Sequence, residues 1–259
     1  MTTTPTPPNT NPPMYQSLEP LDRQHHRNLK MKEGVSPVPR AAGLNSLFLA
    51  VVEFADACKE FPIVFVPVGA APTDGSKQAI APLAVLGLTP GTNLFIKDGV
   101  WTGRYQPAYL RRYPFVMARL EGVANDSMAV CIDSQWEGFS ETEGLPLFND
   151  KGEATDVMTN AHAFTESFER EAERTRAACD HLLKYDLLQE MRFEATLPDG
   201  NKLNVEGFLA VDEKKLAELP DASVLEMHRN GLLGLIEMHR VSMGNMARLA
   251  DMQAALPKA

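Results

Sequence analysis

Apolar residues in the first half of the chain occur in short runs that are separated by turn-forming pairs. The run at residues 63–68 is rich in β-branched and aromatic residues, which is typical of buried strands. Further strand candidates lie at residues 82–88 and 93–97, and Asp-Gly or Pro-Gly pairs punctuate this region. Because the turns are closely spaced, we expect these strands to pair antiparallel.

Two pairs of apolar runs flank turn-like tetrapeptides and predict β-hairpins. They are residues 115–120 with 128–133 around a turn at 124–127, and residues 192–197 with 203–211 around a turn at 198–201. The second turn, Pro-Asp-Gly-Asn, contains the residue types that tight turns require. Between the hairpins, residues 134–159 are rich in Gly, Asp, Glu and Asn, so we expect a long loop there.

Helical spacing begins after this loop. A long helix is predicted with Asn160 as its cap and with Glu166 and Arg170 paired four residues apart on its polar face. Its apolar stripe consists of Phe164, Phe168, Ala172, Thr175, Cys179 and Leu182. Shorter helices are expected at residues 53–60 and 212–219.

The C-terminal stretch, residues 223–255, also carries Leu and Met at helical spacing. Gly231, Gly234 and Gly244 interrupt it and are expected to mark bends or close packing. The sequence Glu-Met-His-Arg occurs at residues 226–229 and again eleven residues later, which returns to nearly the same helical face. The expected inward stripe is Leu225, His228, Leu232, Leu235, His239, Ser242, Met246 and Leu249.

These patterns together predict an α+β fold. Its N-terminal half is antiparallel and β-rich with short helices, and a long central helix, a β-hairpin and a C-terminal helix follow. Residues 1–13 are rich in Pro, Thr and Asn, which favours a disordered tail. We therefore expect a disordered or extended N-terminal arm over residues 1–40 and a single domain over residues 41–255.

Composition narrows the classes of function. The formal net charge is -9, which disfavours nonspecific binding to nucleic acid or to anionic membranes. No apolar stretch is long enough to span a membrane, and the N-terminus lacks the features of a secretory signal, so cytoplasmic residence is expected. Cys58, Cys131 and Cys179 are far apart and are expected to be buried small hydrophobes.

An Arg/aromatic segment, residues 101–115, is the strongest candidate for binding. It interleaves three arginines with five aromatic rings. Guanidinium groups recognise carboxylates and phosphates, and flat rings stack on ligands, so an anionic small molecule or a protein partner would suit it. The candidate ligand-binding residues are Trp101, Arg104, Tyr105, Tyr109, Arg111, Arg112, Tyr113 and, as a lid residue in the acidic loop, Trp136.

A structural role for the Arg/aromatic segment is the alternative. Arginines that stack on tyrosines and pair with nearby acids also occur in ordinary connections between elements. The acids available for such pairing are Asp133, Glu137, Glu141 and Glu143. Exposure of the guanidinium groups decides between the two interpretations.

Histidines supply the other candidates. His228, His239 and Ser242 lie on the expected inward stripe, where we expect buried polar side chains that hydrogen-bond to the backbone. Two histidines eleven residues apart on a helix are about 16 Å apart, so they cannot share one metal ion. His25 and His26 are adjacent in the arm, and two such ligands make a poor site, so no metal is expected.

Familiar catalytic motifs are absent from the sequence. It contains no G-x-G-x-x-G, no Walker A motif, no H-E-x-x-H and no G-x-S-x-G. Ordinary nucleotide enzymes and hydrolases are therefore disfavoured, no cofactor is expected, and catalytic residues are unknown.

Several blocks of the chain resemble the bacterial SapC-like family. They are residues 60–65, 86–88, 93–95, 105–115, 144–148 and 228–242, and the similarity extends from about Leu44 to Leu249. The block Arg-Arg-Tyr-Pro-Phe at residues 111–115 is the most specific. The resemblance implies links of some members to bacterial surface layers and an association of relatives with oxygenase-like and flavin halogenase-like proteins and outer-membrane receptors.

Three functions therefore stand as hypotheses. The leading one is a non-enzymatic or accessory binding protein that engages an anionic ligand or partner through the Arg/aromatic segment. The second is an enzyme or accessory factor in an oxygenase- or halogenase-associated system that modifies a carbohydrate or peptide. The third is a surface-layer-associated protein.

Overall fold

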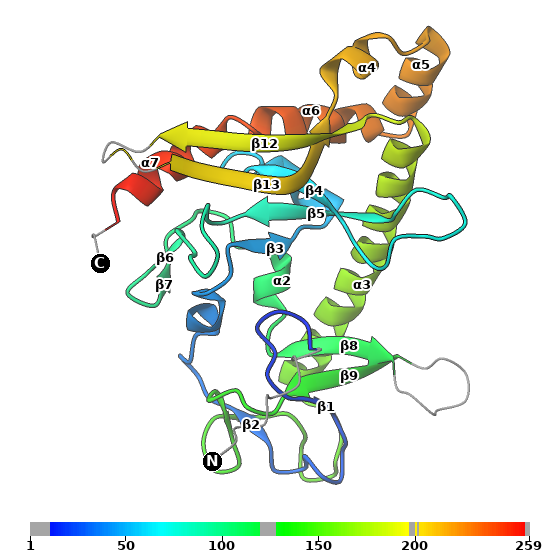
Figure 1. Ribbon diagram of the computed structural model, residues 1–259. Coiled ribbons are helices and arrows are strands. Elements are labelled where there is room, and N and C mark those ends of the chain that lie inside the picture. The colour runs from blue at the N-terminus through cyan, green and yellow to red at the C-terminus, as the bar shows by residue number, and fades with distance from the viewer. Residues whose placement is uncertain (1–10, 120–127, 197–199, 201, 257–259) are drawn as a thin grey trace. The chain divides into compact units, whose positions relative to one another are not determined.

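A computed structural model of the chain describes residues 11–119, 128–196, 200 and 202–256. Contacts divide the chain into two compact units. The first, unit 1, consists of residues 1–40 and 112–169, and the second, unit 2, consists of residues 41–111 and 170–259. Antiparallel sheets and helices occur in both, which confirms the α+β class (Figure 1). The single domain expected over residues 41–255 stays a prediction.

Unit 2 contains a five-stranded antiparallel sheet. Its strands follow the order β12 (Leu188–Thr196), β13 (Lys202–Val211), β4 (Ile63–Pro67), β5 (Ile80–Val85) and β3 (Ser46–Phe48). The two predicted runs around residues 63–68 and 82–88 pair directly, with Val64 opposite Leu83. The predicted C-terminal hairpin is present as β12 and β13, and most of its turn lies outside the described residues.

The strand expected at residues 93–97 is much shorter than predicted. Only β6 (Ile96–Lys97) forms, and it pairs with β7 (Val100–Trp101). The Asn93 side chain explains the difference, because its amide donates to the Ala41 carbonyl at 3.1 Å and accepts from the Phe95 backbone N–H at 3.0 Å. This side chain therefore competes with strand geometry at the start of the run.

Unit 2 also contains several short helices, of which α6 (Leu232–Ser242) packs against β13 and β4. The region expected as one helix at residues 53–60 forms a 3-10 turn, η2 (Val51–Glu53), followed by α1 (Phe54–Ala57). The remaining helices are α2 (Ala108–Arg111), α4 (Glu213–Ala217), α5 (Asp221–Arg229), α6 (Leu232–Ser242) and α7 (Asn245–Ala254). Asp212 caps α4 by accepting from the backbone N–H groups of Lys214 and Lys215.

Unit 1 is built on two small sheets. One has the order β1 (Leu18–Pro20), β9 (Met128–Asp133) and β8 (Phe115–Arg119), and the other has the order β10 (Phe139–Ser140), β2 (Lys30–Met31) and β11 (Leu145–Pro146). Strands β8 and β9 are the predicted first hairpin, whose turn lies outside the described residues. The core consists of Phe115, Val130, Ile132, Leu147, Phe148 and Met158.

Part of the expected N-terminal arm forms regular structure. Strand β1 pairs with β9 and strand β2 pairs with β10 and β11, so residues 18–31 contribute to both sheets of unit 1. The 3-10 turn η1 (Val38–Ala41) closes this region. Residues 1–10, which include most of the expected disordered tail, lie outside the described residues.

The long central helix is α3 (Asp156–Lys184), and it contributes residues to both units. It begins at Asp156, four residues before the predicted cap, so Asn160 is a helical residue and not the cap. Phe168, Thr175, Cys179 and Leu182 of the predicted stripe are buried. Glu166 and Arg170 are both exposed, and their pairing stays a prediction.

Burial of the three cysteines matches expectation at two positions. Cys131 and Cys179 are buried, but Cys58 is only half-buried at the end of α1, so the expectation is wrong there. No helix in the described part of the chain is both long and apolar enough to cross a membrane.

Candidate functional site

The Arg/aromatic segment is divided between the two units. Residues 101–111 belong to unit 2, and residues 112–115, together with Trp136, belong to unit 1. The side chains of the two parts therefore belong to different units and are described separately. Arg104 and Tyr105 of unit 2 line a cavity, and Arg112, Tyr113 and Trp136 of unit 1 are buried.

A buried glutamate positions the backbone of unit 2's part of the segment. Glu60 is only 6% exposed, and its carboxylate accepts hydrogen bonds from the backbone N–H of Arg104 at 2.9 Å and of Tyr105 at 3.2 Å. Gly103 makes this approach possible, since a Cβ there would lie 2.9 Å from Oε2 of Glu60 and 2.9 Å from Nε1 of Trp101. These contacts fix the backbone from which the Arg104 side chain projects.

A second buried glutamate holds the next part of the segment. Oε1 of Glu53 accepts from the Tyr105 hydroxyl and from the Ala108 N–H, both at 2.7 Å, and Oε2 accepts from the Ala50 N–H at 2.9 Å. Burial, and then the Glu53 carboxylate, raises the pKa of Tyr105 above its usual value, so this phenol stays protonated. The charges of Glu53 and Glu60 are thus directed at backbone amides and a hydroxyl.

Aromatic rings pack near these residues in unit 2. Phe61 lies 4.7 Å from Phe95 between ring centroids, and Phe95 stacks on Trp101 at 5.7 Å. Nε1 of Trp101 donates to the Tyr105 carbonyl at 2.9 Å, and the Arg248 guanidinium lies 5.9 Å from the Phe95 ring centre. Trp101 therefore positions Tyr105, and Phe95 supports the charged group of Arg248.

The resulting cavity has a volume of about 690 Å³, and we call it the arginine pocket. It is lined by Asp56, Lys59, Glu60, Arg104, Tyr105 and Arg248. Lys59 forms an ion pair with Asp56 at 2.8 Å. Across the described ranges, neither Arg104 nor Arg248 has a carboxylate partner, so two guanidinium groups are available in the pocket.

Arg111 and Tyr109 belong to unit 2 but do not line the arginine pocket. Nε of Arg111 donates to the Gln106 carbonyl at 3.0 Å, and its guanidinium lies 5.8 Å from the Tyr105 ring centre. Tyr109 is buried, with 6% exposure. The structure thus brings Arg104 and Tyr105 together in the pocket and leaves these two candidates outside it.

Arg112 and Tyr113 are buried in unit 1. The Arg112 guanidinium lies 4.2 Å from the Phe168 ring centre and 3.5 Å from Glu169. The Tyr113 hydroxyl donates to Asp133 at 2.8 Å, and burial raises the pKa of this phenol above its usual value. Both side chains are therefore part of the interior of unit 1, as the structural interpretation of the segment expects.

The prediction of a surface lid at Trp136 is wrong. Trp136 is only 5% exposed, because its ring packs edge-on against Tyr113 at 6.0 Å and against Phe139 at 5.1 Å. Glu137 pairs with Arg40, which lies outside the Arg/aromatic segment. Asp133 accepts from Tyr113 and from the backbone N–H groups of Gln16 and Ser17.

The C-terminal histidines have different environments. His239 and Ser242 are buried in α6, where Nδ1 of His239 donates to the Ile63 carbonyl at 2.7 Å and Nε2 accepts from the Val211 N–H at 3.1 Å. The prediction of burial is wrong for His228, which is exposed on α5. Gly231 ends α5 with a φ of 82°, so the two histidines lie on separate helices and share no face.

Several residues of the pocket carried no signal in the sequence. Lys59 and Arg248 lie far from the Arg/aromatic segment in the sequence, and only the tertiary structure brings them to it. Glu53 and Glu60 gave a weak signal, since each is an acid that borders an apolar run. A charged residue in such a position is expected to be either exposed or satisfied by buried donors.

Comparison with known proteins identifies one family. A family model described as SapC matches residues 21–249 of the chain. No curated protein and no solved structure matches the chain.

Proposed function

The chain belongs to the SapC family, and from this premise we propose that it is a non-enzymatic or accessory protein that binds a small anionic molecule in the arginine pocket. The carboxylate or phosphate of the ligand would bind Arg104 and Arg248. A protein partner that presents such a group is the alternative ligand.

The observation that carries this proposal is the state of the two guanidinium groups. Arg104 and Arg248 line the same cavity, and no carboxylate of the described residues pairs with either of them. A guanidinium group is always charged and presents a planar set of donors that matches a carboxylate or phosphate. Two such groups beside one cavity favour an anion with two acceptor groups or one phosphate.

The remaining lining residues are compatible with an anion. Lys59 adds a third positive charge, although Asp56 already pairs with it. Glu60 contributes a carboxylate, but its oxygens accept from the backbone N–H groups of Arg104 and Tyr105. A volume of about 690 Å³ lies in the range of small-molecule sites, so the ligand is the size of a metabolite.

The pocket also revises the roles of the sequence candidates. Arg104 is proposed to contact the ligand, whereas Trp101 and Tyr105 position the loop that carries it. Arg112, Tyr113 and Trp136 are buried in unit 1 and are no longer proposed as ligand contacts. Arg248 and Lys59 replace them.

Isothermal titration with phosphate and with citrate tests the proposal. We expect wild-type protein to bind at least one of these anions and the double variant Arg104→Gln/Arg248→Gln to bind it at least about tenfold more weakly, because each substitution removes a charge-assisted hydrogen bond. The variant Arg229→Gln is the control, since Arg229 is an exposed arginine of α5 outside the pocket. Equal binding by wild type and double variant, or no binding by wild type, contradicts the proposal.

The two other functional hypotheses stay predictions. Cytoplasmic residence and a surface-layer role are separated by cell fractionation with an antibody against the chain. Copurification of the chain with an oxygenase-like or halogenase-like protein would support a role in a modification system. The fractionation would show where the protein acts, and the copurification would show with which proteins it acts.

A further inference from the structure

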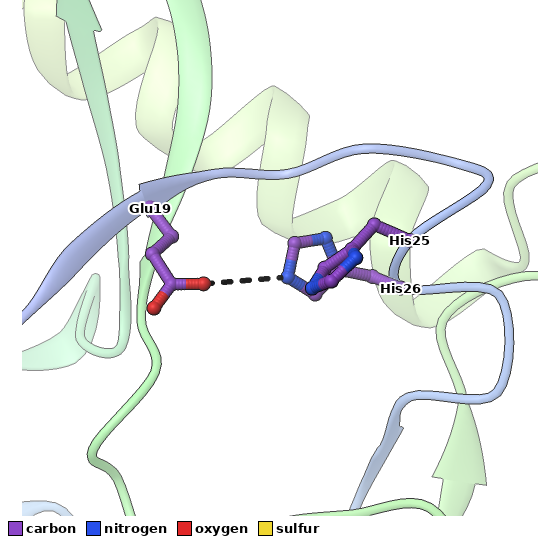
Figure 2. A group of neighbouring side chains, drawn as sticks. All are labelled: Glu19, His25 and His26. Atoms are coloured by element: carbon purple, nitrogen blue, oxygen red, sulfur yellow. Dashed lines mark ion pairs between the residues drawn. The ribbon is translucent and has the colours of Figure 1, made fainter.

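A group of three potential metal ligands lies in unit 1 and includes His25 and His26, the adjacent histidines at which no metal was expected from the sequence. Glu19 is on β1, and His25 and His26 follow in the turn after it (Figure 2). Each of the three offers one ligand atom, and these atoms all lie within 4.8 Å of one another. Nε2 of His26 is 3.8 Å from Oε2 of Glu19.

The turn brings the two adjacent histidines to the same place. The Asp22 carboxylate accepts from the backbone N–H groups of Gln24 at 2.8 Å and His25 at 2.7 Å, and the Asp22 carbonyl accepts from the His26 N–H at 2.9 Å. These bonds close one helix-like turn. The two imidazole rings lie edge to face in it, with centroids 4.9 Å apart.

Glu19 is oriented independently of the histidines. Strand β1 fixes its backbone, where Glu19 is opposite Ile132 of β9. The Ser134 hydroxyl donates to Oε1 of Glu19 at 2.6 Å, and Oε2 is the oxygen nearer to His26. Figure 2 shows the Glu19 carboxylate directed toward the two imidazole rings. A hydrogen bond to the second oxygen of a ligating carboxylate is the usual outer-shell support of a metal site.

We propose that Glu19, His25 and His26 bind a divalent transition-metal ion, with Zn²⁺ as the best match. Two imidazoles and one carboxylate are the ligand types that zinc prefers, and they leave a fourth position for water. Donors at about 2.0–2.1 Å from a tetrahedral ion are about 3.3 Å apart. The three donors therefore need to approach by up to about 1.5 Å, which the exposed His25 side chain can supply by rotation.

Metal binding requires a change of tautomer at His26. The Asp22 backbone N–H donates to Nδ1 of His26 at 3.1 Å, so in the neutral ring the proton is on Nε2, the nitrogen beside Glu19. An ion bound at Nε2 takes the place of this proton, and the proton moves to Nδ1. Since Nδ1 then becomes a donor, the Asp22 N–H loses its partner, and its NMR signal reports on metal binding at this nitrogen.

The site would tie the turn at residues 22–28 to strand β1. Without metal, the same turn is held by the Asp22 hydrogen bonds and by the contact between Glu19 and His26. All three ligands and Ser134 belong to unit 1. The proposal is therefore independent of the anion-binding role of unit 2.

Isothermal titration of the EDTA-treated full chain with ZnCl₂ tests the proposal. The parent is Cys58→Ser, because the half-buried Cys58 is a second potential zinc ligand. We expect one Zn²⁺ to bind, and we expect Glu19→Gln and His25→Ala each to weaken binding by at least about tenfold. The control is His162→Ala, which removes an exposed histidine from α3 and is expected to leave binding unchanged.

Two further measurements distinguish a built site from scattered surface binding. Ser134→Ala keeps all three ligands but removes the hydrogen bond to Glu19, and we expect it to weaken Zn²⁺ binding by about tenfold. The amide signal of Asp22 is expected to shift on addition of Zn²⁺ in the parent and to stay in place in His26→Ala. Equal Zn²⁺ binding by the parent and by Glu19→Gln/His25→Ala, or no binding by the parent, would overturn the proposal.

Discussion

Arg111 and Arg112 are adjacent in the chain but have opposite environments. Arg111 is exposed at the end of α2, whereas Arg112 is 7% exposed and lies over the Phe168 ring. An isolated charge is costly to bury, but a guanidinium that has an aromatic face on one side and an acid on the other is tolerated. Arg112 is therefore a structural residue of unit 1.

Alanine substitutions at these two positions should have different effects on stability. We expect Arg112→Ala to lower the free energy of unfolding by about 2–3 kcal/mol, because it removes buried packing and the contact with Glu169. Arg111→Ala is the matched control, with an expected change within about 1 kcal/mol. Urea unfolding followed by circular dichroism measures both. Equal losses of unfolding free energy in Arg111→Ala and Arg112→Ala would contradict the structural role of Arg112.

His239 is a second residue whose chemistry is decided by burial. Burial lowers the pKa of His239 from its usual 6.5 to about 4, so the folded protein holds the ring neutral with its proton on Nδ1. The unfolded chain binds a proton to the same ring at higher pH. The contribution of His239 to stability is therefore complete above pH 6.5 and decreases as the pH falls toward 4.

This linkage predicts a pH dependence that one substitution removes. Between pH 7.5 and pH 5.5, we expect the wild type to lose about 1 kcal/mol more unfolding free energy than His239→Gln, because the glutamine at position 239 does not titrate and all other groups are the same in both proteins. Urea unfolding at the two pH values measures the difference, and carboxylates contribute equally to both proteins. A parallel pH dependence of the two proteins would show that His239 is not held neutral.

At the scale of elements, glycines divide the C-terminal region into three helices. Gly231 has a φ of 82° and separates α5 from α6, while Gly244 lies directly before α7. Gly234 lies within α6, and a Cβ there would meet nothing within 4 Å. The expectation that these glycines mark bends is thus correct for Gly231. Gly234 has a helical backbone that any residue can adopt.

Alanine at these two glycines should change stability in opposite directions. Gly231→Ala is expected to cost about 1–2 kcal/mol, since a left-handed backbone is strained for a residue with a Cβ. Gly234→Ala is expected to stabilise the protein by about 0.5–1 kcal/mol, because alanine has the higher helix propensity and the position has space. Thermal unfolding of both variants is the measurement. A gain of stability for Gly231→Ala would indicate that the helix break is unnecessary.

The elements themselves were largely predictable from local patterns. Residues 63–67 form a strand because a run of β-branched and aromatic residues can be buried on both faces of a sheet. Helix α3 begins at Asp156, four residues before the cap predicted at Asn160, and the expected strand at 93–97 was too long. The error in the strand arises because the hydrogen bonds of the Asn93 side chain decide where it begins.

At the scale of the whole molecule, charge limits the possible partners. The chain has 34 acidic and 25 basic residues, and a surface of this kind repels phosphate backbones. The arginine pocket is a local exception, with three cationic and two acidic lining residues. Binding of a small anion is therefore expected to depend on direct contacts in the arginine pocket and not on the electrostatic field of the whole protein.

This balance predicts no nonspecific binding to nucleic acid. In a gel-shift assay at 150 mM NaCl, we expect a 30-base-pair DNA duplex to remain unbound at about 10 μM protein, because too few phosphates would be neutralised. A basic DNA-binding protein serves as the positive control. Binding that weakens steeply as salt increases would contradict the prediction and would indicate a basic surface that the net charge conceals.

The sequence by itself determined the α+β class, the antiparallel hairpins and the long helix, because periodicity and turn residues act over a few positions. It also carried the family resemblance that the SapC match confirms. Only the tertiary structure decided which charged residues are available, because Arg104 meets Arg248 and Lys59 in one cavity while Arg112 is buried. Contacts between distant segments set burial and ion pairing, and local patterns do not contain them.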